Sequence, residues 1–342
     1  MNTKTRIRYI DIAKCIAMVL VIHNHWMADY HNSLIKIFIA SFHMPAFFLL
    51  SGLTIKTPNS RRELMGHIFK RIKIIMLPFY LWSFCFVGFG AKRLIMLLYG
   101  SNLSISSIGG IGGSWFIPCF FVADIITCLV LYFCKNNKKG LLTFTGLLLT
   151  VSYLLNKLHL TYGFPFSLDV ACLGAGFICI GHLLSEFNTF AYIEKSKSFI
   201  KFLIFSLSIG LTLFLPFTNK AACLNSYGRP VMALGYYGNL LLFILGGIAG
   251  SLMIIILSIY IQNTLLGKKI EPIGRNTFTI LMLQQSVINL IEGIIIGIGV
   301  SLNFVIPIIL SIICLFACDC ISKVITCVYP NLKGVAVLKR AE

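Results

Sequence analysis

Apolar stretches long enough to cross a lipid bilayer recur along the whole of this chain. A bilayer core of about 30 Å needs roughly 20 apolar residues in a helix, and a spanning segment must satisfy its own backbone hydrogen bonds. With 58% hydrophobic and 12% charged residues, the chain is too apolar for a soluble domain. We therefore predict an all-α, polytopic integral membrane protein of about ten transmembrane helices, at residues 9–28, 34–55, 74–91, 115–134, 141–157, 166–186, 199–216, 240–262, 276–296 and 303–328.

The distribution of basic residues predicts how these helices cross the membrane. The net charge is +18, and 21 Lys and Arg residues fall at the N-terminus, in alternate loops and in the C-terminal tail, against five in the opposite loops. Cytoplasmic loops carry such an excess, so we expect both termini in the cytoplasm. The positive charge is thus a topology signal that also suits anionic lipid headgroups, and nucleic acid is not an expected partner.

The chain is expected to form one unit. It shows no internal repeat, no soluble appendage and no cleavable signal peptide, so residues 1–342 are predicted as a single transmembrane domain without a soluble extracellular domain. Twelve cysteines are scattered through the spans without a paired framework. Cys314, Cys318 and Cys320 lie beside Asp319, but no histidine joins them, and no metal site is predicted.

Polar residues mark the first span as more than an anchor. Asp11, Lys14 and His25 are spaced to share one helix face, which also carries Met18 and Val21. The eleven residues from Lys14 to His25 end roughly 20° from a whole number of turns and rise about 16 Å. An ionisable residue within a span is a functional-site hypothesis, and an imidazole handles protons near neutral pH. The alternative is a histidine satisfied near a helix end.

Other candidate residues each have a functional and a structural interpretation. His43 faces His25 or satisfies a backbone freed by Pro45, which is expected to kink the second span. The basic segment before the third span either anchors it or cradles phosphates. Trp115 is an interfacial anchor or an acceptor contact, and the glycine-rich run before it lacks the Gly-Lys-Ser/Thr end of a phosphate-binding loop. Intramembrane carboxylates such as Asp124 cannot be paired from sequence.

Three stretches resemble the membrane-bound acyltransferase 3 family. Asp-Ile-Ala-Lys, ten residues and then His25 resembles its first helix, with Lys14 where most members have Arg. Phe-His-Met-Pro-Ala-Phe-Phe-Leu-Leu-Ser-Gly is similar to its fucose 4-O-acetylase-like branch, and Gly274 to Ile280 is close to its Gly-x-Asn-Ser/Thr-x-x-Ile pattern. Similar matches exist for FKRIKIIMLPFY and for Trp-Phe-Ile-Pro at Trp115. The chain departs at Gln284, where members commonly carry histidine.

The resemblance implies a function and a set of site residues. It implies a cytoplasmic-membrane O-acyltransferase, most specifically an O-acetyltransferase, that uses acetyl-CoA to acetylate a hydroxyl of a cell-surface polysaccharide or its lipid-linked precursor. The implied residues are His25, Lys14 and Asp11 for catalysis, Arg71, Lys73 and Lys70 for the donor, and His43, Ser51 and Trp115 for the acceptor. The alternative is a secondary transporter that uses the same polar residues as a proton or solute path.

Overall fold

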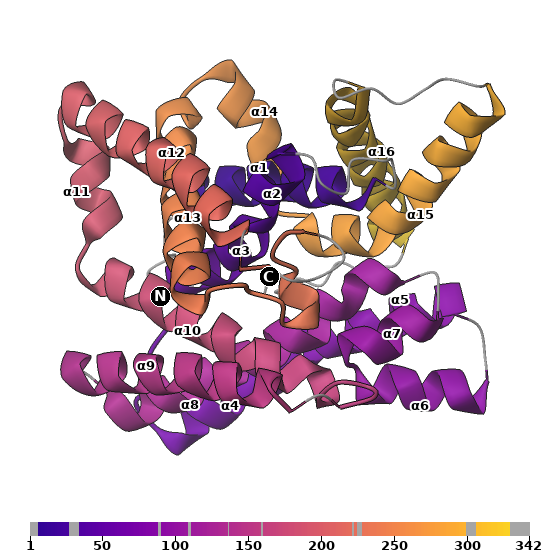
Figure 1. Ribbon diagram of the computed structural model, residues 1–342, viewed down its shortest axis with the longest axis horizontal. Coiled ribbons are helices and arrows are strands. Elements are labelled where there is room, and N and C mark those ends of the chain that lie inside the picture. Colours follow the sequence, from indigo (N-terminus) through magenta and orange to yellow (C-terminus); the bar gives the residue numbers. More distant parts are fainter. Residues whose placement is uncertain are drawn as a thin grey trace, which may run out of the picture.

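The computed structural model describes residues 6–26, 34–87, 90–108, 111–135, 137–158, 160–220, 222–223, 228–298 and 306–328, and this part of the chain is almost entirely helical (Figure 1). The longer helices are α1 (Arg8–His25), α8 (Phe116–Cys134), α9 (Lys138–Asn156), α10 (Leu168–Glu186), α12 (Ser198–Lys220), α13 (Leu240–Ile261), α15 (Thr277–Gly297) and α16 (Ile306–Val328). The shorter α-helices are α2 (Leu34–Ala40), α3 (His43–Gly52), α4 (Arg61–Arg71), α5 (Leu77–Val87), α6 (Ala91–Tyr99), α7 (Asn102–Ile108), α11 (Thr189–Lys195) and α14 (Leu265–Gly274). A π-helix η1 (Ile72–Met76) and three 3₁₀ turns, η2 (Gly112–Trp115), η3 (Pro165–Ser167) and η4 (Met232–Leu234), connect them.

Seven helical segments are long and apolar enough to cross a membrane, which fits an all-α polytopic membrane protein. The expected count was about ten. The other three predicted spans fall on α1, on η1 with α5, and on α9, which are helical but are not among the seven. α1 carries Arg8, Asp11 and Lys14 in its first two turns, and α5 has 11 residues. α12 presents a broad apolar surface to its surroundings, as a lipid-facing helix would, through Phe199, Phe202, Leu203, Leu207 and Phe214.

Polar residues cap the helices where the chain turns between spans. The Ser60 hydroxyl accepts a hydrogen bond from the Glu63 backbone N–H at the start of α4. Asn137, Asn239 and Thr264 cap α9, α13 and α14 in the same way. Each cap satisfies a backbone donor that the first helical turn leaves free, so the sequence itself sets these starting points.

Glycines let two central helices cross at backbone contact. A side chain on Gly181 of α10 would lie 2.1 Å from the Leu49 carbonyl oxygen of α3, and one on Gly52 would lie 2.1 Å from that of Ile178. Small residues at such crossings allow close helix packing without a hydrophobic driving force. α1 lies in the middle of the bundle and packs on α3, α13, α14, α15 and α16 (Figure 1).

The second predicted span breaks at a different residue from the one expected. α2 ends at Ala40 and α3 begins at His43, so the break lies at Ser41 and Phe42. Pro45 lies in the first turn of α3, where a missing N–H costs no helical hydrogen bond. The predicted kink at Pro45 is therefore wrong in position.

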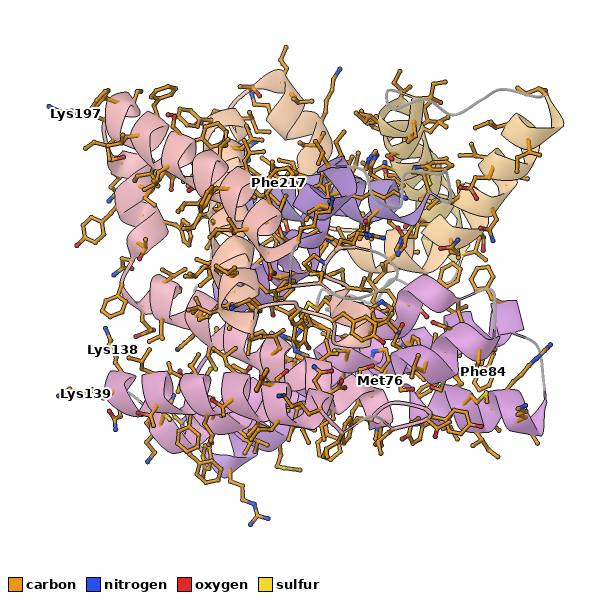
Figure 2. All side chains as sticks on the ribbon, in the orientation of Figure 1. Met76, Phe84, Lys138, Lys139, Lys197 and Phe217 are labelled. Carbon is orange, nitrogen blue, oxygen red and sulfur yellow. The ribbon has the colours of Figure 1, made fainter. Side chains whose placement is uncertain are left out.

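The starts of α9 and α12 lie toward one edge of the molecule. Lys138 and Lys139 at the start of α9 lie at the same edge of the view as Lys197, just before α12, although the two groups are well separated along it (Figure 2). Phe84 of α5 lies near the opposite edge (Figure 2). The side of the membrane on which these lysines lie stays a prediction.

Candidate functional site

A cavity of about 260 Å³ opens beside the N-terminal half of α1. Lys14, Met18 and Val21 line it from successive turns of that helix. Met44, Phe47 and Ser51 of α3 lie on the same cavity, together with residues before and within α15. Three residues of the predicted face of α1, Lys14, Met18 and Val21, thus point into one cavity of the protein.

Four cations line this cavity: Arg6, Lys14, Arg71 and Arg275. The carboxylate of Asp11, only 2% exposed, holds three of them. Its oxygens lie 2.5 Å from Nε of Arg6, 3.6 Å from Nε of Arg275 and 3.8 Å from Nζ of Lys14. Hydrogen bonding to this carboxylate raises the pKa of Arg6. One carboxylate against three cations leaves net positive charge at the cavity wall.

Gly274 brings Arg275 to the cavity. A side chain at Gly274 would lie 1.8 Å from the carbonyl oxygen of Asp11, so only glycine permits this contact between α14 and α1. Glu271, one turn earlier, bonds Arg275 and also accepts from Nε of Arg8 at 2.8 Å. The hydrogen bond from Arg8 lowers the pKa of Glu271, and that from Arg275 adds to the effect. Asn276, which follows Arg275, donates from Nδ2 to Oδ1 of Asp319 at 3.0 Å and so links the end of α14 to α16.

Arg71 is held by a carboxylate from another helix. Its Nε and Nη2 donate to the two oxygens of Asp124 at 2.9 and 2.6 Å, which is the bidentate geometry that fixes a guanidinium. Asp124 is fully buried in α8, and Nε2 of His67 lies 2.5 Å from its Oδ2. Sequence reasoning did not identify His67, although it lies one turn before Arg71 on α4.

Of the three residues predicted to bind the donor, only one lines the cavity. Arg71 lines the cavity, whereas Lys70 and Lys73 are exposed and lie outside its lining. The π-helix η1 begins directly after Arg71, and its Ile74 and Ile75 line the cavity. Such π-turns recur at functional sites, and this one was not predicted from the sequence.

The ring of His25 lies one turn beyond Val21 on the same face of α1, and it is not part of the cavity lining. A side chain at Gly113 of η2 would lie 3.3 Å from Cε1 of His25 and 3.4 Å from Nε2 of Gln284. Both side chains therefore pack against this glycine. Nδ1 of His25 is buried without a hydrogen-bond partner among the described residues. Gly113, at the end of the glycine-rich run, thus forms part of the wall beside His25.

Further polar groups surround the C-terminal end of α1. Arg229 donates to Oδ1 of Asn24 at 2.5 Å, and Nζ of Lys36 donates to the Trp26 carbonyl at 2.7 Å. Both cations lie within electrostatic range of His25. The sequence of residues 217–239 allows two interpretations, an acceptor site that uses Asn225, Tyr227 and Arg229 or, more simply, an ordinary surface loop. Asn225 and Tyr227 lie outside the described residues.

The three predicted acceptor residues occupy different places. Ser51 lines the cavity. His43 lies within electrostatic range of His25, but its Nδ1 donates to the Ile39 carbonyl at 2.7 Å, at the break between α2 and α3. Trp115 is buried beside Phe116, which lines the cavity, while Trp115 itself does not. His43 thus satisfies a carbonyl at the α2–α3 break, not one freed by Pro45, and it also lies near His25.

A family comparison covers the part of the chain that forms this site. A family model described as an acyltransferase domain, that of the acyltransferase 3 family, matches residues 7–323. The matched stretch runs from the start of α1 into α16 and includes every site residue named above except Arg6. No curated protein and no solved structure matches the chain.

Proposed function

Because the chain belongs to the acyltransferase 3 family and is thus a multi-pass membrane acyltransferase, we propose that it transfers acetyl groups. In this proposal acetyl-CoA is the donor, and a hydroxyl of a cell-surface polysaccharide or its lipid-linked precursor is the acceptor. The enzyme would act in the cytoplasmic membrane. The observation that supports this best is the face of α1, which runs from a cation-lined cavity to the half-buried His25.

The cavity suits the anionic part of such a donor. Guanidinium groups bind phosphate bidentately, and Arg6, Arg71 and Arg275 are each oriented by a carboxylate. A cavity of about 260 Å³ is smaller than a typical site for a drug-sized ligand, so it would hold only a part of CoA. The apolar residues Met18, Val21, Met44 and Ile117 would then contact the thioester arm as it extends along α1.

His25 is the proposed proton-handling group. In one route the acceptor oxygen attacks the acetyl carbonyl carbon, its proton passes to the imidazole of His25, and the C–S bond breaks to release a thiolate that takes up a proton. In the other route an imidazole nitrogen attacks the carbonyl carbon first and the C–S bond breaks to release the thiolate; the acceptor oxygen then attacks the acetyl-imidazole, its C–N bond breaks, and the hydroxyl proton goes to the thiolate. Asp124 contacts His67 and Arg71, so it is not the group that orients His25.

A pulse of labelled acetyl-CoA distinguishes the two routes. The purified protein is incubated briefly with the donor and without acceptor, then denatured and assayed for bound label. Label on wild-type protein that His25→Ala lacks supports the second route. Its absence, combined with transfer once acceptor is added, supports the first.

The proposal itself is tested in cells. Surface glycans are analysed by mass spectrometry in a deletion strain complemented with wild-type protein or with His25→Ala. The proposal expects O-acetyl groups with the wild type and their loss with the variant. Glycans that carry the same O-acetyl groups in the deletion strain would contradict it, and solute movement without acetyl-CoA would favour the transporter alternative.

A further inference from the structure

A second cavity, of about 200 Å³, lies among the loops and helix ends on the side of the bundle where α1 ends. Ser101 and Asn102, at the start of α7, line it, α9 ends there at Asn156, and α10 begins there after Ser167. The turn around η4 closes it with Gly235 and Tyr236. We propose that this cavity binds a neutral sugar unit of the acceptor glycan, at a subsite separate from the reacting centre.

The chemistry of the lining fits hydroxyl groups better than phosphates. The described residues that line it include hydroxyls, two amides and one carboxylate, and they include no lysine or arginine. Phe164 and Tyr236 add aromatic rings, which offer an apolar face beside these polar groups. The cation-lined cavity has the opposite character, so the two cavities suit two different ligands.

The half-buried amide of Asn156 lines this cavity. Its side chain interacts with Tyr237, while its Nδ2 makes no hydrogen bond of good geometry within the described residues. An acceptor atom of a bound ligand would therefore improve the hydrogen bonding of this amide. The position of Asn156 is fixed by Gly235, which has φ +71° and where any side chain would overlap Oδ1 of Asn156.

The walls of the cavity are preformed by hydrogen bonds within the protein. The Tyr99 hydroxyl donates to the Gly163 carbonyl at 2.7 Å, and the Asn102 N–H donates to Oγ of Ser167 at 3.0 Å. Phe166 and Ser167 both adopt left-handed backbone conformations, with φ of 54° and 50°. Such strain in non-glycine residues is found at ligand sites and persists only where the surroundings impose it.

The cavity is also coupled to the histidine by packing. α7, whose first residue Asn102 lines it, packs on η2, and Gly113 of η2 lies against His25. A glycan held in this cavity would therefore lie on the far side of α7 and η2 from the reacting ring. The role of its ligand as acceptor rests on the proposed function, whereas binding itself does not.

The test measures binding and transfer separately. The probe is the surface polysaccharide of the producing cell after mild alkaline removal of its O-acetyl groups. Hydrogen–deuterium exchange of the full-length protein is followed in segments 99–108, 152–158 and 231–237, and acetyl transfer is measured as a function of probe concentration. The variants are Asn156→Leu and Tyr236→Ala, since Tyr236 is 45% exposed and its loss leaves the core intact. The control is Thr150→Val, an exposed position earlier on α9.

The proposal expects the probe to slow exchange in these segments of the wild type and of Thr150→Val. In each cavity variant it expects protection and acceptor affinity to fall about threefold to tenfold, as loss of one hydrogen bond or ring contact would cause. Wild-type transfer with no protection of these segments overturns it, as does unchanged acceptor dependence in both variants. Protection without any transfer would instead contradict the proposed function and leave the sugar site standing.

Discussion

The position of the His25 ring depends on the absence of a side chain at Gly113. Gly113 has no side chain, and an added Cβ would come within 3.4 Å of both His25 and Gln284. The spacing in α1 identified His25 because a helix repeats every 3.6 residues, so position on a face can be read from sequence. Gly113 could not be found in this way, since it meets His25 only through the packing of η2 on the bundle.

Gly113→Ala tests that placement. We expect the imidazole to shift by a few tenths of an ångström, and the initial rate of acetyl transfer to fall about tenfold, because misplacement near a reacting group is costly. The melting temperature should change little. Gly146→Ala is the control, because nothing lies within 4 Å of a side chain there. Equal rates for the two variants would show that Gly113 does not position the ring.

The contact between α1 and α14 positions the cations. Gly274 was recognised from a pattern, but its reason is geometric: its backbone lies against the Asp11 carbonyl, which places Arg275 near the Asp11 carboxylate. The pairing of Arg71 with Asp124, 53 residues apart, was beyond sequence reasoning, because no local spacing relates two helices. Lys70 and Lys73 were grouped with Arg71 because they are close to it in sequence. They are exposed and do not line the cavity, so sequence proximity was misleading here.

Gly274→Ala should separate these two helices. An overlap of the new Cβ with the Asp11 carbonyl oxygen forces a backbone shift, and we expect a loss of about 1–3 kcal/mol in unfolding free energy together with weaker donor binding. Thermal unfolding in detergent and titration with CoA measure the two effects. Gly66→Ala on α4, where the added atom meets open space, should leave CoA affinity unchanged and should not lower the unfolding free energy, since alanine favours a helix. A stable Gly274→Ala variant with normal CoA affinity would exclude this role for the contact.

The ion pairs of Glu271 give this contact a pH dependence. Arg8 and Arg275 lower the pKa of Glu271 below its ordinary value, so the folded state binds its proton less readily than the unfolded chain. The resulting stability is fully present above the ordinary pKa of a glutamate, about 4.3, and is lost as the pH falls through the lower pKa of the folded state.

Glu271→Gln should remove that dependence. We expect the variant to lose about 1–2 kcal/mol at neutral pH, and its difference from the wild type to shrink as the pH falls below about 4. Melting temperatures of both proteins across this range provide the measurement. A difference that stays constant with pH would mean that the charge of Glu271 does not stabilise the fold.

At the scale of the molecule, the cation-lined cavity and His25 follow one another along α1, and the second cavity lies beyond η2 and α7. The fold class was predictable from sequence because apolar length is a strong constraint, and seven helices meet it. The number of spans is harder to predict, because a helix such as α1 carries charged residues of the site and is therefore less apolar than an ordinary span. Packing of α3, α14, α15 and α16 around α1 decides the site, and no single helix sequence specifies that packing.

The predicted topology is open to a direct check. Single cysteines at Lys139 and Lys197 should react with a membrane-impermeant maleimide only from the cytoplasmic side, and one at Lys157 only from outside. The exposed Cys85, Cys320 and Cys327 are first changed to serine to remove background. Labelling of Lys139→Cys and Lys197→Cys from opposite sides would contradict the arrangement.

The most direct test of the account is acetyl transfer by protein reconstituted in proteoliposomes, with labelled acetyl-CoA and the de-O-acetylated polysaccharide. His25→Ala is compared with His23→Ala, which removes a second buried imidazole two residues away on the same helix. The account predicts that His25→Ala loses about 10²–10⁴-fold in rate while His23→Ala keeps most of its activity. A correctly inserted His25→Ala protein that transfers acetyl groups at the wild-type rate would contradict it.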